Sequence, residues 1–234
     1  MKRTTVFVGL AFLVVALFAG STTTAVKPTL EERFSETAGA VQKGESGVYT
    51  FDKAHTFIGF KVKHMGLIKV PGFFRDFTGE INYNAEDVTK SSVNFTAKTE
   101  SVDTGVAGRD AHLRRADFFD AEKFPEITFK STKVEKRGDD LYITGNFTLR
   151  GVTKSISFEF DIEGFLPGNQ RKGMTMGVSA DTTIKRFDYG VNYGSNVPAG
   201  APGISNEVEI VLEIEAVKAK EEAAADPAAA RDSN

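Results

Sequence analysis

The sequence predicts an all-β domain over residues 47–217, an antiparallel barrel of about eight strands with one inserted helix. Three observations lead to this prediction. Apolar and polar side chains alternate with period two along most of the region, one helical stretch interrupts them, and phenylalanines gather on the apolar face. Strands with one apolar and one polar face are typical of antiparallel sheet, and they must close into a barrel or pack as a sandwich to hide their edges.

The individual strands are predicted from this alternation. Residues 141–149 alternate apolar with polar side chains, and the alternation resumes from Ile156 to Ile162 after a turn at Arg150-Gly151. From Val208 to Ala216, apolar residues alternate mainly with glutamate. The predicted strands start near Gly47, Phe57, Phe74, Val93, Ile127, Leu141, Ile156 and either Met174 or Val208.

One stretch, Thr104–Phe119, has helical composition instead. Ala111, Leu113 and Ala116 are spaced to share one helix face, and Pro125 ends the stretch. A single helix inserted between strands often serves as a plug or lid, so we expect this one to cover the mouth of the barrel.

Both ends of the chain are predicted to lie outside the domain. Residues 1–25 combine two positive charges, an uncharged apolar stretch and small residues, which indicates a signal peptide cleaved after Ala25. The apolar stretch is shorter than the roughly 20 residues that span a bilayer, which disfavours an uncleaved anchor. Residues 26–46 are predicted to be a polar linker, and residues 218–234 a disordered tail. We therefore expect a periplasmic or secreted protein.

Composition and missing motifs argue against several classes of function. The formal net charge is −3 with no long basic run, which does not fit a nucleic-acid binder. The absence of cysteine excludes disulfides, thiolate metal sites and a cysteine-linked lipid anchor. No nucleophile elbow, phosphate-binding glycine loop, dinucleotide fingerprint or zinc-protease helix is present. We expect a protein that is not an enzyme and has no cofactor.

The phenylalanines suggest a ligand. The chain has 20, and only four precede residue 47. An eight-stranded barrel has an interior just wide enough to be filled by side chains or to enclose one slender ligand. An apolar lining with few polar groups suits a ligand that is bound by area and shape. The predicted ligand lining is Phe60, Val62, Phe77, Phe95, Phe129, Phe147, Phe158 and Phe160.

Candidate polar groups come from the histidines and the helical stretch. We predict that His64, Arg109 and His112 contact the polar end of the ligand, with Arg109 at the barrel entrance for a polar or phosphorylated head group. A solvated helix face is the plainer explanation of the charges between residues 109 and 117. The histidines, His55 included, are too scattered along the chain to form a recognisable ligand set, so no metal site is predicted.

Several segments together resemble the YceI family of bacterial lipid- and polyisoprenoid-binding proteins. They are D-x-x-H-T-x-I-x-F-x-V-x-H at 52–64, G-x-F-x-x-F-x-G at 72–79, the run at 108–129, G-x-x-T-L-R-G-V-T-K at 145–154 and R-x-x-Y-G at 186–190. The last has Tyr189 where the family has phenylalanine. The resemblance spans about residues 49–216 and implies an extended, lipocalin-like barrel in the periplasm, without enzymatic activity. It also implies a bound isoprenoid chain, such as a polyprenyl or quinone tail.

Two hypotheses follow. In the first, the barrel holds a long apolar lipid for transport, storage or sequestration. In the second, side chains fill the barrel, and the protein is a stress or accessory protein that acts through a surface such as residues 109–117 or the loop 194–206. A continuous cavity favours the first, and phenylalanine rings meeting across the axis favour the second. Transient membrane contact and a homodimer remain open as further partners.

Overall fold

The computed structural model describes residues 42–194 and 203–219. The predicted signal peptide, most of the predicted linker and tail, and most of the loop 194–206 lie outside the described residues. Within the described part, no helix is long and apolar enough to cross a membrane.

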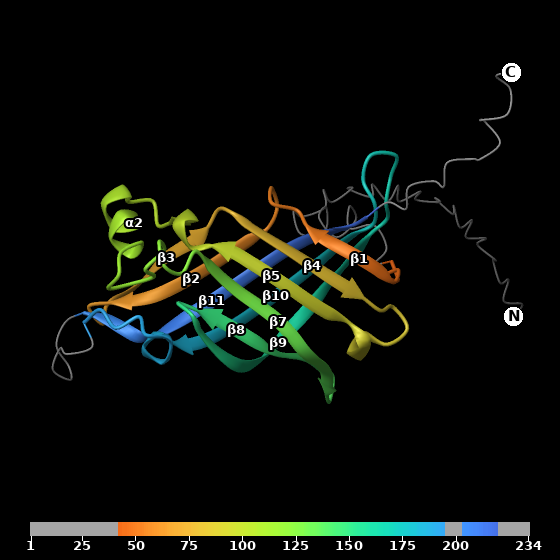
Figure 1. Cartoon of the computed structure of the whole chain (residues 1–234). Coiled ribbons are helices and arrows are strands. Elements are labelled where there is room, and N and C mark those ends of the chain that lie inside the picture. The colour runs from red at the N-terminus through yellow and green to blue at the C-terminus, as the bar shows by residue number, and fades with distance from the viewer. Residues whose placement is uncertain (1–41, 195–202, 220–234) are drawn as a thin grey trace, which may run out of the picture. The chain divides into compact units, whose positions relative to one another are not determined.

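Strands make up nearly all of the regular structure (Figure 1). The one α-helix among the described residues is α2 (Ala107–Leu113). The strands are β1 (Gly47–Phe51), β2 (Phe57–His64), β3 (Ile68–Phe74), β4 (Phe77–Tyr83), β5 (Ser92–Lys98), β6 (Val102–Asp103), β7 (Glu126–Arg137), β8 (Asp140–Leu149), β9 (Val152–Leu166), β10 (Thr175–Lys185) and β11 (Ile204–Lys218).

Eight of these strands close a ring. Hydrogen-bonded neighbours run β1–β4–β5–β7–β8–β9–β10–β11, and β11 pairs back to β1. All of the pairings are antiparallel. The predicted all-β fold, an eight-stranded antiparallel barrel with one inserted helix, is therefore confirmed. Closure removes the exposed edges that an open sheet of this size would present.

The barrel is extended because β11 is long enough to serve two partners. Its first part, from Ile204 to Glu213, pairs with β2, and its last part pairs with β1. The chain leaves the sheet between β1 and β2, and there the backbone N–H of Asp52 and the hydroxyl of Thr56 both donate to the carbonyl of Glu215. β3 continues the wall beyond β2, and β6 pairs with β3. Toward the α2 end, the barrel wall beside β11 is therefore formed by β2 and β3. Toward the other end it is formed by β1 and β4.

Three features differ from the sequence prediction. The helix is only seven residues long and occupies the middle of the predicted stretch Thr104–Phe119. Gly105 has a φ of +77° just before it, and the residues after it form turns. Both β10 and β11 are present where the prediction placed one strand, and β3 precedes the predicted start at Phe74.

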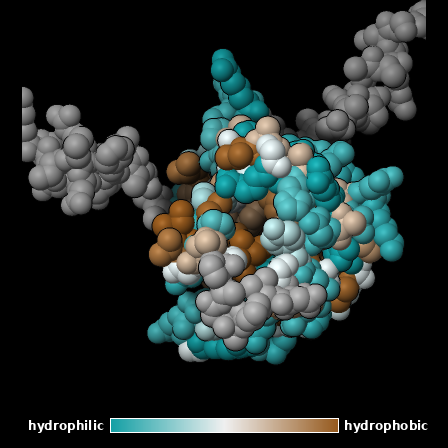
Figure 2. Space-filling view, turned by 90° about the vertical axis from the view of Figure 1, so that its left-hand side faces the viewer, coloured by the Kyte–Doolittle hydropathy of each residue, from teal (hydrophilic) through white to brown (hydrophobic). Residues whose placement is uncertain are grey.

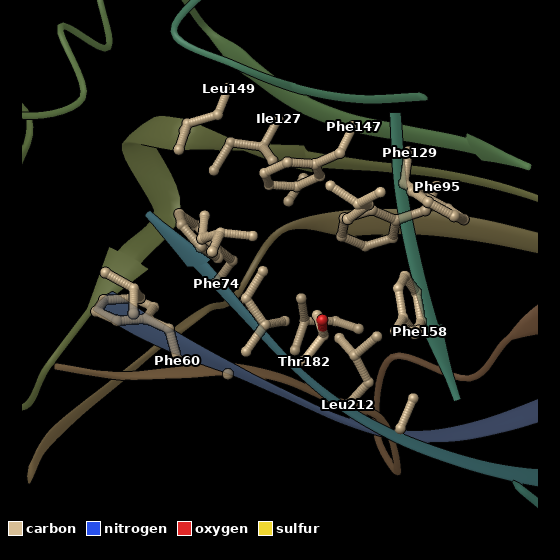
Figure 3. A pocket seen from close by; sticks show the side chains of 18 of the residues that line it. Phe60, Phe74, Phe95, Ile127, Phe129, Phe147, Leu149, Phe158, Thr182 and Leu212 are labelled. Atoms are coloured by element: carbon tan, nitrogen blue, oxygen red, sulfur yellow. The ribbon is translucent and has the colours of Figure 1, made fainter. Parts of the chain in front are cut away.

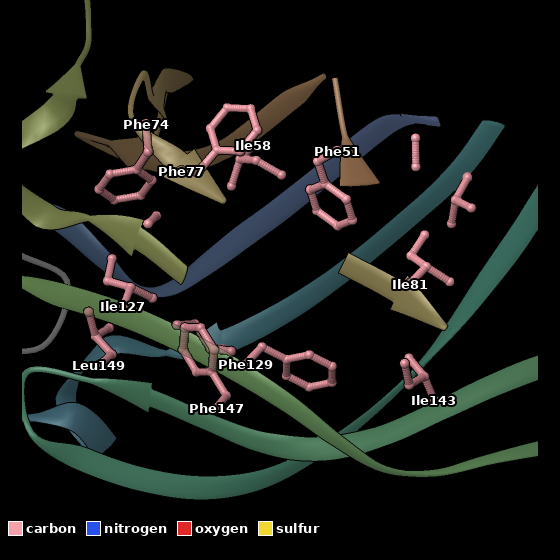
Figure 4. Close-up of a cluster of buried hydrophobic side chains, with 14 of the residues drawn as sticks. Phe51, Ile58, Phe74, Phe77, Ile81, Ile127, Phe129, Ile143, Phe147 and Leu149 are labelled. Carbon is pink, nitrogen blue, oxygen red and sulfur yellow. The ribbon is translucent and has the colours of Figure 1, made fainter. Parts of the chain in front are cut away.

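Alternation sets the inner and outer faces as predicted. Ile143, Gly145, Phe147 and Leu149 of β8 are buried, whereas their neighbours along the strand are exposed or half-buried. Figure 4 shows inward side chains of this kind from several strands, among them Phe51, Ile81 and Phe129. The core is therefore the inner surface of the barrel.

Candidate functional site

The barrel encloses a cavity of about 410 Å³ (Figure 3). Its volume lies in the usual range of small-molecule sites, roughly 300–1,000 Å³. The described residues that line it include no aspartate, glutamate or lysine. The polar or ionisable side chains in the lining are His64, Tyr83, Ser91, Thr104, Arg109, His112, Thr182 and Arg186.

Inward side chains confirm that the interior is hollow. Phe158 and Phe160 of β9, and Ile210, Leu212 and Ile214 of β11, line the cavity yet are only half-buried. In a filled barrel, opposing side chains would pack against them at the density of other protein interiors and cover them. Their remaining exposed surface therefore faces the cavity.

Strand register gathers phenylalanines on one wall. Phe95 of β5 is directly opposite Phe129 of β7, which in turn is directly opposite Phe147 of β8. Figure 3 shows these three rings reaching into the pocket from neighbouring strands. Cross-strand neighbours on one face of a sheet lie close enough for their side chains to touch. The wall is therefore a continuous aromatic surface.

Glycines leave room for two of the lining phenylalanine rings, those of Phe51 and Phe129, to lie flat against the wall. A Cβ atom added at Gly79 would lie 2.2 Å from the Phe51 ring, and one added at Gly145 would lie 2.4 Å from the Phe129 ring. Each ring therefore covers a glycine on another strand and takes the space that a side chain would fill. Because the rings lie over backbone, they leave the axis of the barrel open.

Seven of the eight predicted lining residues do line the cavity: Phe60, Val62, Phe95, Phe129, Phe147, Phe158 and Phe160. Phe77 does not. It is 3% exposed and belongs to the buried core, directly after the bend at Arg75-Asp76 between β3 and β4. Phe77 does point to the inner face of the barrel, as predicted, but neighbouring side chains cover it and separate it from the cavity.

The three residues predicted for the polar end, His64, Arg109 and His112, also line the cavity. The Arg109 guanidinium donates to the hydroxyl and the carbonyl of Thr104. The Nε2 atom of His112 lies 2.7 Å from the Asp117 carboxylate. All three residues lie at the end of the barrel that carries α2, where Figure 2 shows a hollow with apolar side chains inside it and on its left.

Arg186 is a lining residue that the sequence prediction omitted. It is 4% exposed and donates to the carbonyls of Ser205, Val191 and Ile204. Burial lowers the pKa of its guanidinium. The R-x-x-Y-G motif was the available signal, but the charges around it also fitted an ordinary turn between strands.

A second cluster of ionisable groups lies outside the cavity lining. Single ligand atoms of Asp52, His55 and Glu215 lie within 4.8 Å of one another, a spacing that could hold a metal ion. The Lys172 ammonium already contacts both carboxylates, at 3.2 Å from Asp52 and 2.5 Å from Glu215. Hydrogen bonds, first from His55 and then from the Ala54 N–H, lower the pKa of Asp52 to about 2. These contacts describe an ion-pair cluster that joins β1, β11 and the β9–β10 turn.

Comparison with known proteins agrees with this architecture. The Campylobacter jejuni YceI protein is 34% identical, with a TM-score of 0.59 over 74% of this chain and 98% of its own. BcnA of Burkholderia cenocepacia has a TM-score of 0.62 at 20% identity, over 70% of this chain and 98% of its own. A polyisoprenoid-binding domain from Saccharophagus degradans has a TM-score of 0.57 at 16% identity, over 75% of this chain and all of its own.

Sequence comparison identifies the family. Protein YceI of Salmonella arizonae is 38% identical over 174 residues, which cover 74% of this chain and 87% of that protein. The model of the YceI-like domain matches residues 49–216, nearly the whole barrel. The chain therefore belongs to the YceI-like family.

Proposed function

We propose that the barrel binds one long apolar lipid of the isoprenoid type, and that the protein acts by binding rather than by catalysis. The observation that carries this proposal is the cavity inside the barrel, with its apolar lining that contains no acidic side chain. The Saccharophagus degradans domain, whose described property is polyisoprenoid binding, supports the choice of lipid. The apolar segment near the N-terminus supports export, so we place the protein in the periplasm or outside the cell.

Apolar contact alone can hold such a ligand. At about 25 cal/mol per Å², burying on the order of 400 Å² of lipid tail contributes about 10 kcal/mol. Lost translation and rotation cost at least about 4 kcal/mol, so apolar contact without a hydrogen bond gives at best a Kd of tens of micromolar. A polar head group can then add preference among lipids that share a tail.

The alternative, a barrel filled by its own side chains, is less well supported. A filled barrel would have phenylalanine rings that meet across its axis. The rings instead lie over neighbouring strands and leave space between opposite walls. We therefore assign the function to the interior.

Extraction of the native protein tests the proposal. Protein purified from its own host is extracted with organic solvent, and the extract is analysed by mass spectrometry. We expect an isoprenoid or related long-chain lipid near one molecule per chain. Repeated preparations that are folded but carry no lipid would overturn the proposal.

The polar end is tested with a matched pair of variants. Arg109 and Arg115 are both exposed, but Arg109 lines the cavity, whereas Arg115 lies just beyond α2 and does not. We expect Arg109→Ala to change the relative affinity for lipids with the same tail and different head groups by roughly 5-fold or more, and Arg115→Ala to leave it unchanged. Equal head-group preference in both variants would remove Arg109 from the site.

A further inference from the structure

Large apolar side chains are exposed around the mouth of the barrel. Leu67 is 81% exposed, Ile68 64% and Val106 50%, and Met65 and Tyr193 are each 44% exposed. Met65 and Leu67 lie in the β2–β3 turn, directly after the lining residue His64, and Ile68 is the first residue of β3. Val106 is the N-cap of α2, and Tyr193 stacks on the lining residue Phe118. We call these five residues the apolar rim; Figure 2 views the barrel from this end.

The β2–β3 turn has an unusual backbone for its sequence. Met65 and Gly66 both have positive φ, at 54° and 69°, and the Leu67 N–H donates to the His64 carbonyl at 3.0 Å. A non-glycine residue rarely adopts positive φ, and asparagine or aspartate is normally preferred there. Met65 is buried only in part and Leu67 hardly at all, so burial offsets little of the cost of placing them there. An external apolar partner would account for both residues.

The charges beside the rim indicate what kind of partner it fits. Lys63 and Lys69 are directly opposite each other on β2 and β3, an arrangement that opposes folding slightly. Lys69 and Lys61 share one acidic partner, Glu209. Lys63 has no ion pair within the described part of the chain. The hairpin therefore joins an apolar tip to an excess of positive charge.

We propose that the apolar rim docks the barrel, mouth first, on an anionic lipid bilayer. Leu67 and Ile68 would enter the boundary between head groups and acyl chains, and Lys63 and Lys69 would lie at the lipid phosphates. Apolar residues flanked by basic ones bind membrane surfaces in this way. The proposal rests on the proposed lipid binding, because docking at the mouth lets a tail pass between bilayer and cavity without crossing water.

Vesicle flotation tests the docking surface. The protein is mixed with vesicles of phosphatidylcholine alone, or with about one third phosphatidylglycerol added, and the bound fraction is measured. The rim variant is Leu67→Asp, which adds one negative charge as the control does. The matched control is Leu166→Asp, a 57% exposed leucine in the last residue of β9, at the opposite end of the barrel.

We expect the parent and the control to bind anionic vesicles at least about 10-fold more tightly than the rim variant does, with little binding to neutral vesicles. Lys63→Glu should weaken binding by several-fold, and added salt should do the same because it screens the lysines. All variants keep the same termini, so a difference between them reports the rim.

Two outcomes would overturn the proposal: equal vesicle binding by the rim variant and the parent, or a rim-dependent dimer in sedimentation that ignores vesicles. Lipid content is measured by extraction in the same preparations, and a melting curve confirms that each variant is folded. A rim variant that is folded and loaded but does not bind vesicles supports docking. A parent that carries lipid but ignores vesicles refutes docking alone, and an empty parent that binds vesicles refutes the proposed function alone.

Discussion

The two ends of the barrel are built differently. At the end where β1 starts and β4 and β9 finish, the rings of Tyr49, Tyr83 and Phe165 pack on one another at centroid distances of 5.1–6.3 Å. Gly44 lies so close to the Phe165 ring that no side chain would fit there. The opposite end carries the short helix α2, basic lining residues and the exposed apolar rim.

This difference indicates which end can open. Packed aromatic rings and the ion-pair cluster of Asp52, His55, Lys172 and Glu215 hold the first end. The α2 end has packed rings too, such as Phe119 against Phe60 and Phe74, but the helix itself buries no apolar side chain: Asp110 is its one buried residue. Segments with few buried apolar contacts open at lower free energy than the core. We therefore expect a ligand to enter past α2.

The largest expected effect lies between the two ends, in the cavity wall. Phe147→Asp places a carboxylate in an apolar lining and removes a ring that is buried, so we expect a loss of at least about 3 kcal/mol in the free energy of unfolding. Urea unfolding and lipid extraction measure the two consequences, instability and an empty barrel. Asn146→Asp, on the exposed face of the same strand, is the control. A stable and fully loaded Phe147→Asp protein would show that this wall does not contact the ligand.

A pair of truncations compares the two ends directly. Tyr49 is fully buried, and Tyr49→Ala should cost about 3–5 kcal/mol, because it removes a packed ring and the hydrogen bond from its hydroxyl to the Glu45 carbonyl. Phe119 is half-buried beside Phe60 and Phe74 at the α2 end, and Phe119→Ala should cost about 1 kcal/mol. Chemical denaturation checks both values. Equal losses would mean that the mouth is as firmly packed as the opposite end.

Local pattern was enough to predict the wall of the barrel from the sequence. Period-two alternation gave the inner face of β8 and β9 correctly, and this face supplied Phe147, Phe158 and Phe160 to the lining. Which inward residues remain open to the cavity depends on the third dimension. Phe77 faces inward as predicted, but it follows a bend and is covered by its neighbours.

The ends of the barrel were harder to predict, because long-range contacts define them. Arg186 is held in the cavity lining by hydrogen bonds to the carbonyls of residues 191, 204 and 205. The spacing of residues in the sequence does not reveal these hydrogen bonds. The exposed apolar turn at Met65–Ile68 was overlooked because it continues the apolar pattern of the strands on either side. The ion-pair cluster joins Asp52 to Lys172 and Glu215, more than 100 residues apart in the chain.

A smaller change tests how the rings are kept at the wall. Gly79→Ala would place a Cβ against the Phe51 ring, so the ring must move away from β4 toward the cavity. We expect a loss of about 1–2 kcal/mol in stability from overpacking, with reduced uptake of the longest lipids. Competition between tails of different length measures this selectivity. Unchanged selectivity in a folded variant would show that Phe51 does not limit the length of the cavity.

The smallest expected effect concerns the ion-pair cluster and pH. The pKa of Asp52 is about 2 in the folded protein, below its ordinary value of 3.8, so the folded state favours the carboxylate. The cluster therefore contributes stability above about pH 4, and this contribution is lost as the pH falls toward 2. Urea unfolding at several pH values should show Asp52→Asn less stable than the parent at pH 6 and nearly equal to it near pH 2. Asp139→Asn, in the exposed β7–β8 turn, is the matched change. A constant difference between Asp52→Asn and the parent at every pH would mean that Asp52 stabilises this end through geometry and not through its charge.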